Sequence, residues 1–357
     1  MSKSLFRQHF CLRLLSNQSK PNGFTLIELL VAMIVGALIS GGLLFLVIQL
    51  VQTNLREGAR SDTQRDLQAA IDYIARDVRE AVYVYDSNCL DRPAASTVQC
   101  PGLINYLPKN MSGSASNNLP VLAFWRVDQL PQTVKDICLA TYSDPSNFTN
   151  SQSAPAAIRD VPCLSGRMYT LVVYSLNWDS APGLRGRARI RRFELPQFTT
   201  ASASTTPPTP VTGWVDPTRR ETDFFTWPLN KSISTTASSA SLQTSRPVGA
   251  NIVLTDFVDR VGLYADSSGA KAQAPLLAGY ELTPRRGSSA NDEPPRGFYV
   301  YVKGMENRGI LNQEVVIRIQ GDAAGRAGIP NVNPNRPGVP LALETRVLTR
   351  GVTGKTD

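Results

Sequence analysis

The sequence has almost no histidine, and this limits the chemistry that it can perform. Of its 357 residues only His9 is a histidine. A Ser-His-Asp triad, a Cys-His pair and a histidine-ligated metal centre all need this side chain. We therefore predict no enzyme activity, no metal site and no cofactor. A pair of carboxylates can hydrolyse glycosides without histidine, so a tethered glycan-active enzyme stays open as an alternative.

Charge is missing from one long stretch near the N-terminus. The sequence from Leu29 to Ile48 has no charged residue, and the wider apolar run from Phe24 to Val51 holds only Glu28. About 20 apolar helical residues match the roughly 30 Å hydrocarbon core of a bilayer. The apolar part of a secretory signal peptide is shorter, with about 7 to 15 residues. We therefore predict one membrane-spanning helix.

The segment before this helix is basic. Residues 1–23 contain no acidic side chain and four basic ones, namely Lys3, Arg7, Arg13 and Lys20. By the positive-inside rule, the N-terminus is expected in the cytoplasm and the rest of the chain beyond the membrane. Without this segment the net charge falls from +8 to +4. Half of the excess positive charge is thus interpreted as an orientation signal.

A short motif opens the apolar run. Residues 23–28, GFTLIE, resemble the processing signal of type IV prepilins and pseudopilins. The resemblance implies that a prepilin peptidase cuts after Gly23 and that Phe24 becomes the N-methylated N-terminus. It also implies that Glu28 assists assembly by meeting the N-terminal amine of a neighbouring subunit. A carboxylate inside an apolar helix costs a few kcal/mol, and pairing with an amine offsets this cost.

The chain is predicted to stay helical after the span. Leu67, Ile71, Ile74, Val78 and Val82 recur at helical spacing and line one face. The opposite face is predicted to be a solvated charged surface made of Asp66, Asp72, Arg76, Asp77, Arg79 and Glu80. The expected organisation is a basic leader (1–23), a transmembrane or filament-core helix (24–52), an amphipathic second half of the helix (53–85) and an extracytoplasmic domain (86–357).

Strand patterns dominate the remaining sequence. Apolar runs at 121–127 and 169–178 predict strands, and 187–195 returns as a hairpin partner of the second. Alternation at 315–320 and 341–348 predicts two half-buried strands. Loop insertions are expected at about 199–250 and 321–340, the first pinned by aromatic residues at 214 and 224–227. The predicted fold class is α+β, a long N-terminal pilin helix packed on an antiparallel β-sheet domain with long Ser/Thr/Pro-rich loops.

Four cysteines follow the predicted span, namely Cys89, Cys100, Cys138 and Cys163. Disulfides persist outside the cytoplasm, and four cysteines allow three pairings. We favour the sequential pairing because both disulfides would then close local loops. Four free or metal-binding thiols are the alternative, although no spacing resembles CxxC.

A short basic run is a candidate contact for a polyanion. It consists of Arg187, Arg189, Arg191 and Arg192, with Phe193 beside them. A polysaccharide can use such a patch. The alternative is a set of arginines on the open face of a strand, because basic residues act as a patch only when they cluster in space. No specific nucleic acid is expected as a partner.

Three short patches narrow the resemblance. REAVYVYD (79–86), VLAFWR (121–126) and YTLVVYSLNW (169–178) are similar to the pseudopilins of hormogonium polysaccharide secretion in filamentous cyanobacteria. This implies a minor pilin or pseudopilin that helps to initiate or cap a type IV pilus-like filament and supports surface polysaccharide secretion and gliding motility. The implied partners are the prepilin peptidase, other pilins or pseudopilins contacted through the N-terminal helix, an inner-membrane assembly platform and an exported polysaccharide.

The resemblance also implies a location. Before assembly the chain would cross the inner membrane once, with a cytoplasmic N-terminus and a periplasmic C-terminal domain, and it would later join a pilus or pseudopilus, extending to the cell surface. Major pilins commonly carry a proline in the span, and its absence here favours a minor subunit. A membrane-anchored surface adhesin or carbohydrate-binding protein that does not polymerise is the alternative from another class.

Overall fold

The computed structural model divides into two compact units, with the boundary between Asn54 and Leu55. The leader expected at 1–23 lies, up to residue 22, outside the described residues, as do the parts of the expected loops at 231–239 and 331–339. The structure describes residues 23–90, 100, 102–111, 117–144, 155–218, 221–230, 240–249, 251–260, 275, 277–284, 297–304, 312–330 and 340–350.

One long helix, α1, runs from Leu26 to Arg79 and contributes to both units. In the first unit every described side chain is exposed. In the second unit α1 buries one stripe, made of Ala59, Thr63, Leu67, Ala70, Ile71, Ile74, Ala75, Asp77 and Val78. The spacing of three and four residues is that of one helix face, as the sequence predicts.

The helix ends earlier than expected. The predicted helical segment 53–85 stops at Arg79, and Ala81–Val84 forms strand β1 instead. Valine and tyrosine alternate in this stretch and favour a strand, and β1 gains its hydrogen bonds by pairing with β2. Val82, predicted on the helix face, therefore lies on β1 and packs against a second core cluster.

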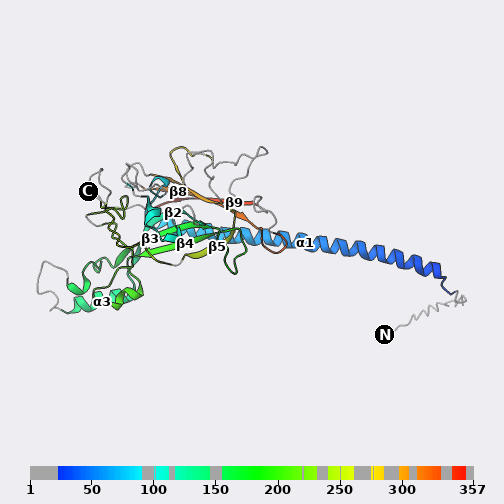
Figure 1. Cartoon of the computed structure of the whole chain (residues 1–357), viewed down its shortest axis with the longest axis horizontal. Helices are drawn as coiled ribbons and strands as arrows, with labels where there is room; N and C mark the ends of the chain where they lie inside the picture. Colours follow the sequence, from blue (N-terminus) through cyan, green and yellow to red (C-terminus); the bar gives the residue numbers. More distant parts are fainter. Residues whose placement is uncertain are drawn as a thin grey trace, which may run out of the picture. The chain divides into compact units, whose positions relative to one another are not determined.

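Within the described ranges, nine strands form one antiparallel sheet (Figure 1). Its order is β1-β2-β3-β4-β5-β8-β7-β6, and β9 pairs with β8. The helices α2 (Ser87–Leu90) and α3 (Gln132–Ser143) lie outside the sheet order. The α+β fold with its antiparallel sheet is confirmed, and all the predicted strands are present. The strands after β1 are β2 (Asn118–Gln129), β3 (Arg167–Asn177), β4 (Ala188–Pro196), β5 (Ile252–Val258), β6 (Glu281–Thr283), β7 (Phe298–Lys303), β8 (Glu314–Asp322) and β9 (Pro340–Leu348).

The main core lies between the apolar stripe of α1 and the sheet. Leu67, Ile74 and Val78 of α1 pack on inward-facing residues of β2, β3, β4, β7 and β8. At Gly321, near the end of β8, an added Cβ would collide with Leu67. The strand thus approaches the helix more closely than any side chain would permit, which explains a glycine inside a strand.

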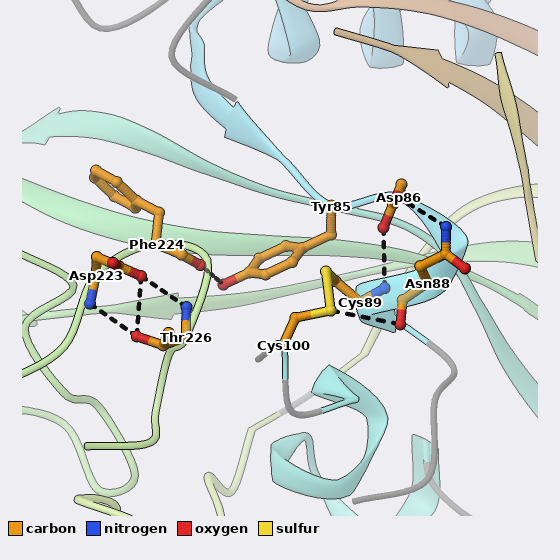
Figure 2. Close-up of a disulfide and its surroundings, with 8 residues drawn as sticks. All are labelled: Tyr85, Asp86, Asn88, Cys89, Cys100, Asp223, Phe224 and Thr226. Carbon is orange, nitrogen blue, oxygen red and sulfur yellow. Dashed lines mark hydrogen bonds between the residues drawn. A yellow bond between two sulfur atoms is a disulfide. The ribbon is translucent and has the colours of Figure 1, made fainter. Parts of the chain in front are cut away.

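A second, aromatic cluster covers the other face of β1 to β4. Trp227 and Phe224, from the expected loop insertion, are buried there against Trp125. The Nε1 of Trp227 donates to the carbonyl of Val215 at 2.9 Å, and the hydroxyl of Tyr85 donates to the carbonyl of Phe224 at 2.7 Å (Figure 2). The predicted role of these aromatic residues in pinning the excursion to the domain is therefore confirmed for the described part of the loop.

Two disulfides close local loops of the domain. Cys89 is bonded to Cys100, and Cys138 is bonded to Cys163 (Figure 2 shows the first). This is the sequential pairing that the sequence favoured. Loops with sequence separations of 11 and 25 each restrict the unfolded chain by an amount worth about 3 kcal/mol. The second disulfide ties α3 to the segment that leads into β3.

Candidate functional site: the assembly helix and a buried charge cluster

The first unit presents an exposed apolar helix surface. Its large side chains are exposed along the whole run, from Leu26 at 86% to Val51 at 48%. Among the described residues, α1 is the helix long and apolar enough to cross a membrane. A continuous apolar surface of this length needs cover from lipid or from other helices. The helix fits a membrane-anchored protein.

The residues predicted to carry processing lie at the open start of this helix. Gly23 has no neighbouring atom near the position of a Cβ, and Phe24 is 83% exposed. The carbonyl of Thr25 accepts from the backbone N–H groups of Glu28 and Leu29, at 3.0 and 3.2 Å, and so begins the helix. Among the described residues, none packs against the start of the helix at Gly23 and Phe24.

Glu28 lies in the first turn of α1. The hydroxyl of Thr25 donates to its Oε2 at 3.4 Å, a long contact, and the side chain is exposed. The N-terminal end of a helix carries partial positive charge, which favours a carboxylate at this position. The carboxylate oxygens remain accessible to a donor from outside the subunit, which is the geometry that the predicted pairing with a neighbouring amine requires.

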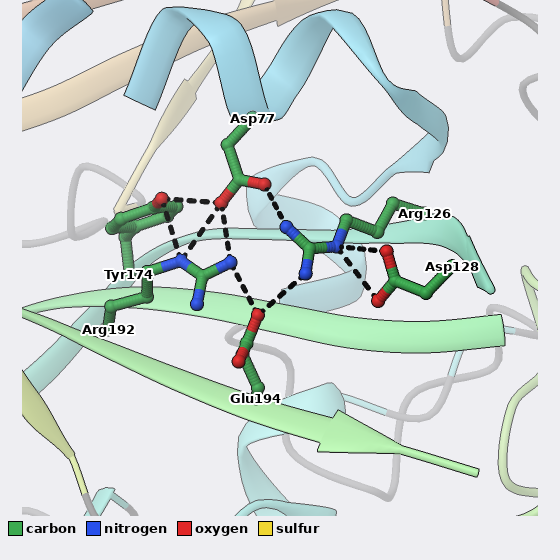
Figure 3. Close-up of polar contacts among 6 residues, drawn as sticks. All are labelled: Asp77, Arg126, Asp128, Tyr174, Arg192 and Glu194. Carbon is green, nitrogen blue, oxygen red and sulfur yellow. Dashed lines mark hydrogen bonds and ion pairs between the residues drawn. The ribbon is translucent and has the colours of Figure 1, made fainter. Parts of the chain in front are cut away.

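The last turns of α1 insert a carboxylate into the domain. Asp77 is only 6% exposed, so its predicted place on a solvated helix face is wrong. Its Oδ2 accepts from the hydroxyl of Tyr174 at 2.6 Å and from Nε of Arg192 at 2.9 Å (Figure 3). Its Oδ1 pairs with the Nη1 of Arg126 at 2.5 Å. The end of the helix is thus held by side chains from β2, β3 and β4.

Two partly exposed acids, Glu194 and Asp128, complete what we call the buried charge cluster, after the burial of Asp77. Glu194 bridges both arginines, with its Oε1 at 2.6 Å from Arg192 Nη2 and 2.8 Å from Arg126 Nη2. Asp128 pairs with Nε of Arg126 at 2.9 Å. Three carboxylates therefore share two guanidinium groups. In Figure 3, Asp77 lies above the two arginine side chains, Glu194 lies below them and Asp128 lies beside Arg126.

The charges in the cluster stabilise one protonation state. Burial lowers the pKa of Arg126, but Asp77, Asp128 and Glu194 together outweigh it and raise the pKa above its usual value. Burial, with Asp77 as the next cause, raises the pKa of the Tyr174 hydroxyl. Both arginines are therefore charged and Tyr174 is a neutral donor at physiological pH. The cluster is suited to fixing the helix on the sheet.

The predicted polyanion contact does not form an exposed basic patch. Arg187 pairs with Asp322 at 3.1 Å, Arg189 is 2% exposed and donates to the carbonyl of Gly186 at 3.0 Å, and Arg192 belongs to the charge cluster. Arg191 is half-buried. Consecutive residues of β4 point to opposite faces, so Arg192 reaches the helix, whereas Arg189 lies on the other face beside Asp256 and the carbonyl of Gly186.

The described residues do not form a candidate metal site. Across these ranges, no group of three or more His, Cys, Asp or Glu side chains is placed to hold a metal ion. The four cysteines that follow the span are joined in disulfides, which leaves no thiolate among them to act as a ligand.

Besides strands β1, β5, β6 and β7, reasoning from the sequence missed the burial of Asp77 and helix α3. The burial of Asp77 had a signal, because Thr63 and Ala70 precede it at intervals of seven and both are buried on the same stripe. Helix α3 had a weaker signal, since buried Val134, Cys138 and Thr141 are spaced by four and three within a polar segment. In both cases a polar or small residue occupied a core position.

The comparisons with known proteins concern the N-terminus. The family model for the prokaryotic N-terminal methylation motif matches residues 18–44. These residues include the expected cleavage position, Glu28 and the first part of α1. No curated protein and no solved structure matches the chain significantly. The motif is the signal of type IV pilins, a structural type of protein, and it supports a pilin-like chain with processing by a prepilin peptidase and assembly with other pilins.

Proposed function

We propose that this pilin-like chain is a minor pilin or pseudopilin that helps to initiate or cap a type IV pilus-like filament. The observation that carries the proposal is the position of the methylation motif, residues 18–44, at the start of an exposed apolar helix. Cleavage after Gly23 would release a mature chain with an N-methylated Phe24. The proposed role is structural and involves no catalysis.

Glu28 is proposed to set the register between subunits. After cleavage, the amine of Phe24 is a cation at the end of an apolar helix, and Glu28 of the next subunit is an anion in a similar environment. Either charge alone is costly in a medium of low dielectric, and their pairing is favourable. Two staggered helices can therefore satisfy both charges only at one offset. The partners in this step would be other pilins or pseudopilins and the inner-membrane assembly platform.

The proposed setting is surface polysaccharide secretion with gliding motility. It rests on the sequence patches 79–86, 121–126 and 169–178, which are similar to hormogonium polysaccharide pseudopilins. In the structure these patches lie at the end of α1 and on the neighbouring strands β1, β2 and β3. They contain Arg126 and Tyr174 of the buried charge cluster. The patches thus lie where the helix docks on the domain. From their similarity we infer that this chain serves the same pathway as the hormogonium polysaccharide pseudopilins.

The proposed route begins in the inner membrane, with the leader in the cytoplasm and the domain in the periplasm. The subunit would then enter a pilus or pseudopilus that extends toward the cell surface. An anchored adhesin or carbohydrate-binding protein would share the apolar helix but would need neither cleavage at Gly23 nor a carboxylate at Glu28. Whether the chain is cleaved after Gly23 therefore distinguishes the two functions.

Replacing Gly23 by Val is expected to block processing when the chain is co-expressed with a prepilin peptidase. A branched side chain at the last leader residue would obstruct the peptidase, while the fold stays intact because Gly23 has open space around it. The measurement is the mass of the membrane-bound product. The wild type should lose residues 1–23, and the variant should keep them.

Gly36→Ala is the matched control for this experiment, because Gly36 also has open space around it and lies downstream in α1. It should be cleaved as completely as the wild type. If the peptidase cuts Gly23→Val normally, or leaves the wild type intact, the proposed processing site is wrong.

A further inference from the structure

The outer face of the β7–β8–β9 strands contains a hollow that the assembly function does not use. Its volume is about 340 Å³, near the lower end of the range for small-molecule sites. All seven residues that line it belong to described segments, and they are Tyr299, Arg318, Ile319, Gln320, Ala342, Leu343 and Glu344.

The register of the strands explains the hollow. Tyr299 lies opposite Arg318, which lies opposite Glu344, so these three form one row across the strands. In the adjacent row Gln320 lies opposite Ala342, which is exposed. The small side chain of Ala342 leaves space beside the larger residues of the first row. A bigger residue at this position would fill the space.

The rim of the hollow offers a donor and an acceptor next to each other. Arg318 Nη2 pairs with Glu344 Oε2 at 2.5 Å, and the two side chains keep 28% and 38% of their surface exposed. Hydroxyl groups placed in the hollow can therefore accept from the exposed part of the guanidinium and donate to the carboxylate.

The walls and the rim together select the class of ligand. Ala342 and the ring of Tyr299 present apolar surface on this face, while the charge of Arg318 is balanced by Glu344. A balanced ion pair disfavours phosphate and other strong anions, which need net positive charge. A purely apolar ligand would leave the charged rim desolvated without compensation. A sugar ring has both an apolar C–H face and neighbouring hydroxyl groups that can donate to Glu344 and accept from Arg318.

We propose that this hollow binds one sugar residue of a neutral polysaccharide. The proposal rests on the proposed function in taking a polysaccharide as the cargo, and it adds the site and the class of glycan. The contact would be weak for one subunit, with roughly millimolar affinity, because a single ring supplies few contacts. A filament tip needs such weak binding if the polysaccharide is to be passed on and released.

The test uses the full chain in a detergent without a sugar headgroup, titrated with cellohexaose, mannohexaose, maltohexaose and the acidic hexaguluronate. At least one neutral hexasaccharide should bind, and hexaguluronate should bind more weakly than that one. Ala342→Leu should lower the affinity at least about tenfold by filling the hollow. Ala140→Leu, at an exposed position on α3, should bind like the wild type. Tryptophan fluorescence checks that both variants are folded.

Three outcomes would overturn the proposal. The first is no binding of any neutral hexasaccharide at about 10 mM, a concentration well above the dissociation constant expected for a single-ring site. The second is tighter binding of hexaguluronate than of every neutral hexasaccharide. The third is unchanged binding by folded Ala342→Leu. None of them bears on cleavage at Gly23 or on Glu28-dependent assembly, which have their own measurements. Failure of the sugar site and failure of the pilin assignment are therefore distinguishable.

Discussion

Glu28→Ala is expected to reduce copurification of the chain with other pilins or pseudopilins at least about tenfold. The substitution removes the anion that would meet the amine of a neighbouring Phe24 and leaves that amine unpaired in an apolar environment. An unpaired charge in an apolar environment costs a few kcal/mol. A loss of about 1.4 kcal/mol in binding free energy already lowers the association constant tenfold. The measurement is recovery of partner subunits with the tagged chain from solubilised native membranes.

The controls for this variant separate charge from position. Glu57→Ala removes an exposed acid from the same helix and should leave copurification unchanged. Glu28→Gln keeps the size of the side chain, so it should behave like Glu28→Ala if the charge matters. Normal recovery of partners with Glu28→Ala would rule out the register role of this carboxylate.

Asp77→Ala is expected to lower the free energy of unfolding of the domain by about 3 to 5 kcal/mol. Removing one member of a buried ion-pair network leaves its partners desolvated without compensation. Here Arg126, Arg192 and Tyr174 would all lose an acceptor. Denaturant unfolding of the full chain in detergent measures the effect, and the buried Trp125 and Trp227 supply the fluorescence signal.

The matched control is Asp72→Ala, which removes an exposed carboxylate from the same helix and should change stability by about 0.5 kcal/mol or less. A loss with Asp77→Ala no larger than with Asp72→Ala would show that the cluster does not hold the helix on the sheet. Asp77→Asn should fall between the two, because the amide keeps one acceptor but cannot compensate both arginines.

Much of the fold was predictable because its signals are local. The uncharged run from Leu29 to Ile48 indicates the apolar helix, and the 3.6-residue pattern at Leu67, Ile71, Ile74 and Val78 identifies its buried face. Alternation along residues 315–320 and 341–348 identifies β8 and β9. The start of the candidate site was predictable for the same reason, since Gly23, Phe24 and Glu28 lie within six consecutive residues.

The features that escaped prediction depend on contacts between distant segments. Asp77 looks like part of a charged face until Arg126 and Arg192 are brought beside it, at sequence separations of 49 and 115. The run from Arg187 to Arg192 looked like one basic patch, yet the strand sends its members to two faces and to different acids. The hollow at Ala342 depends on the register of three strands, which local patterns do not specify.

The most direct test of the account is the N-terminus of the native protein, determined by mass spectrometry and N-terminal sequencing of chains isolated from membranes and sheared filaments. The account predicts a chain that begins at Phe24 with a methylated α-amine and lacks residues 1–23. A native chain that still begins at Met1 would contradict it and would identify an uncleaved membrane anchor.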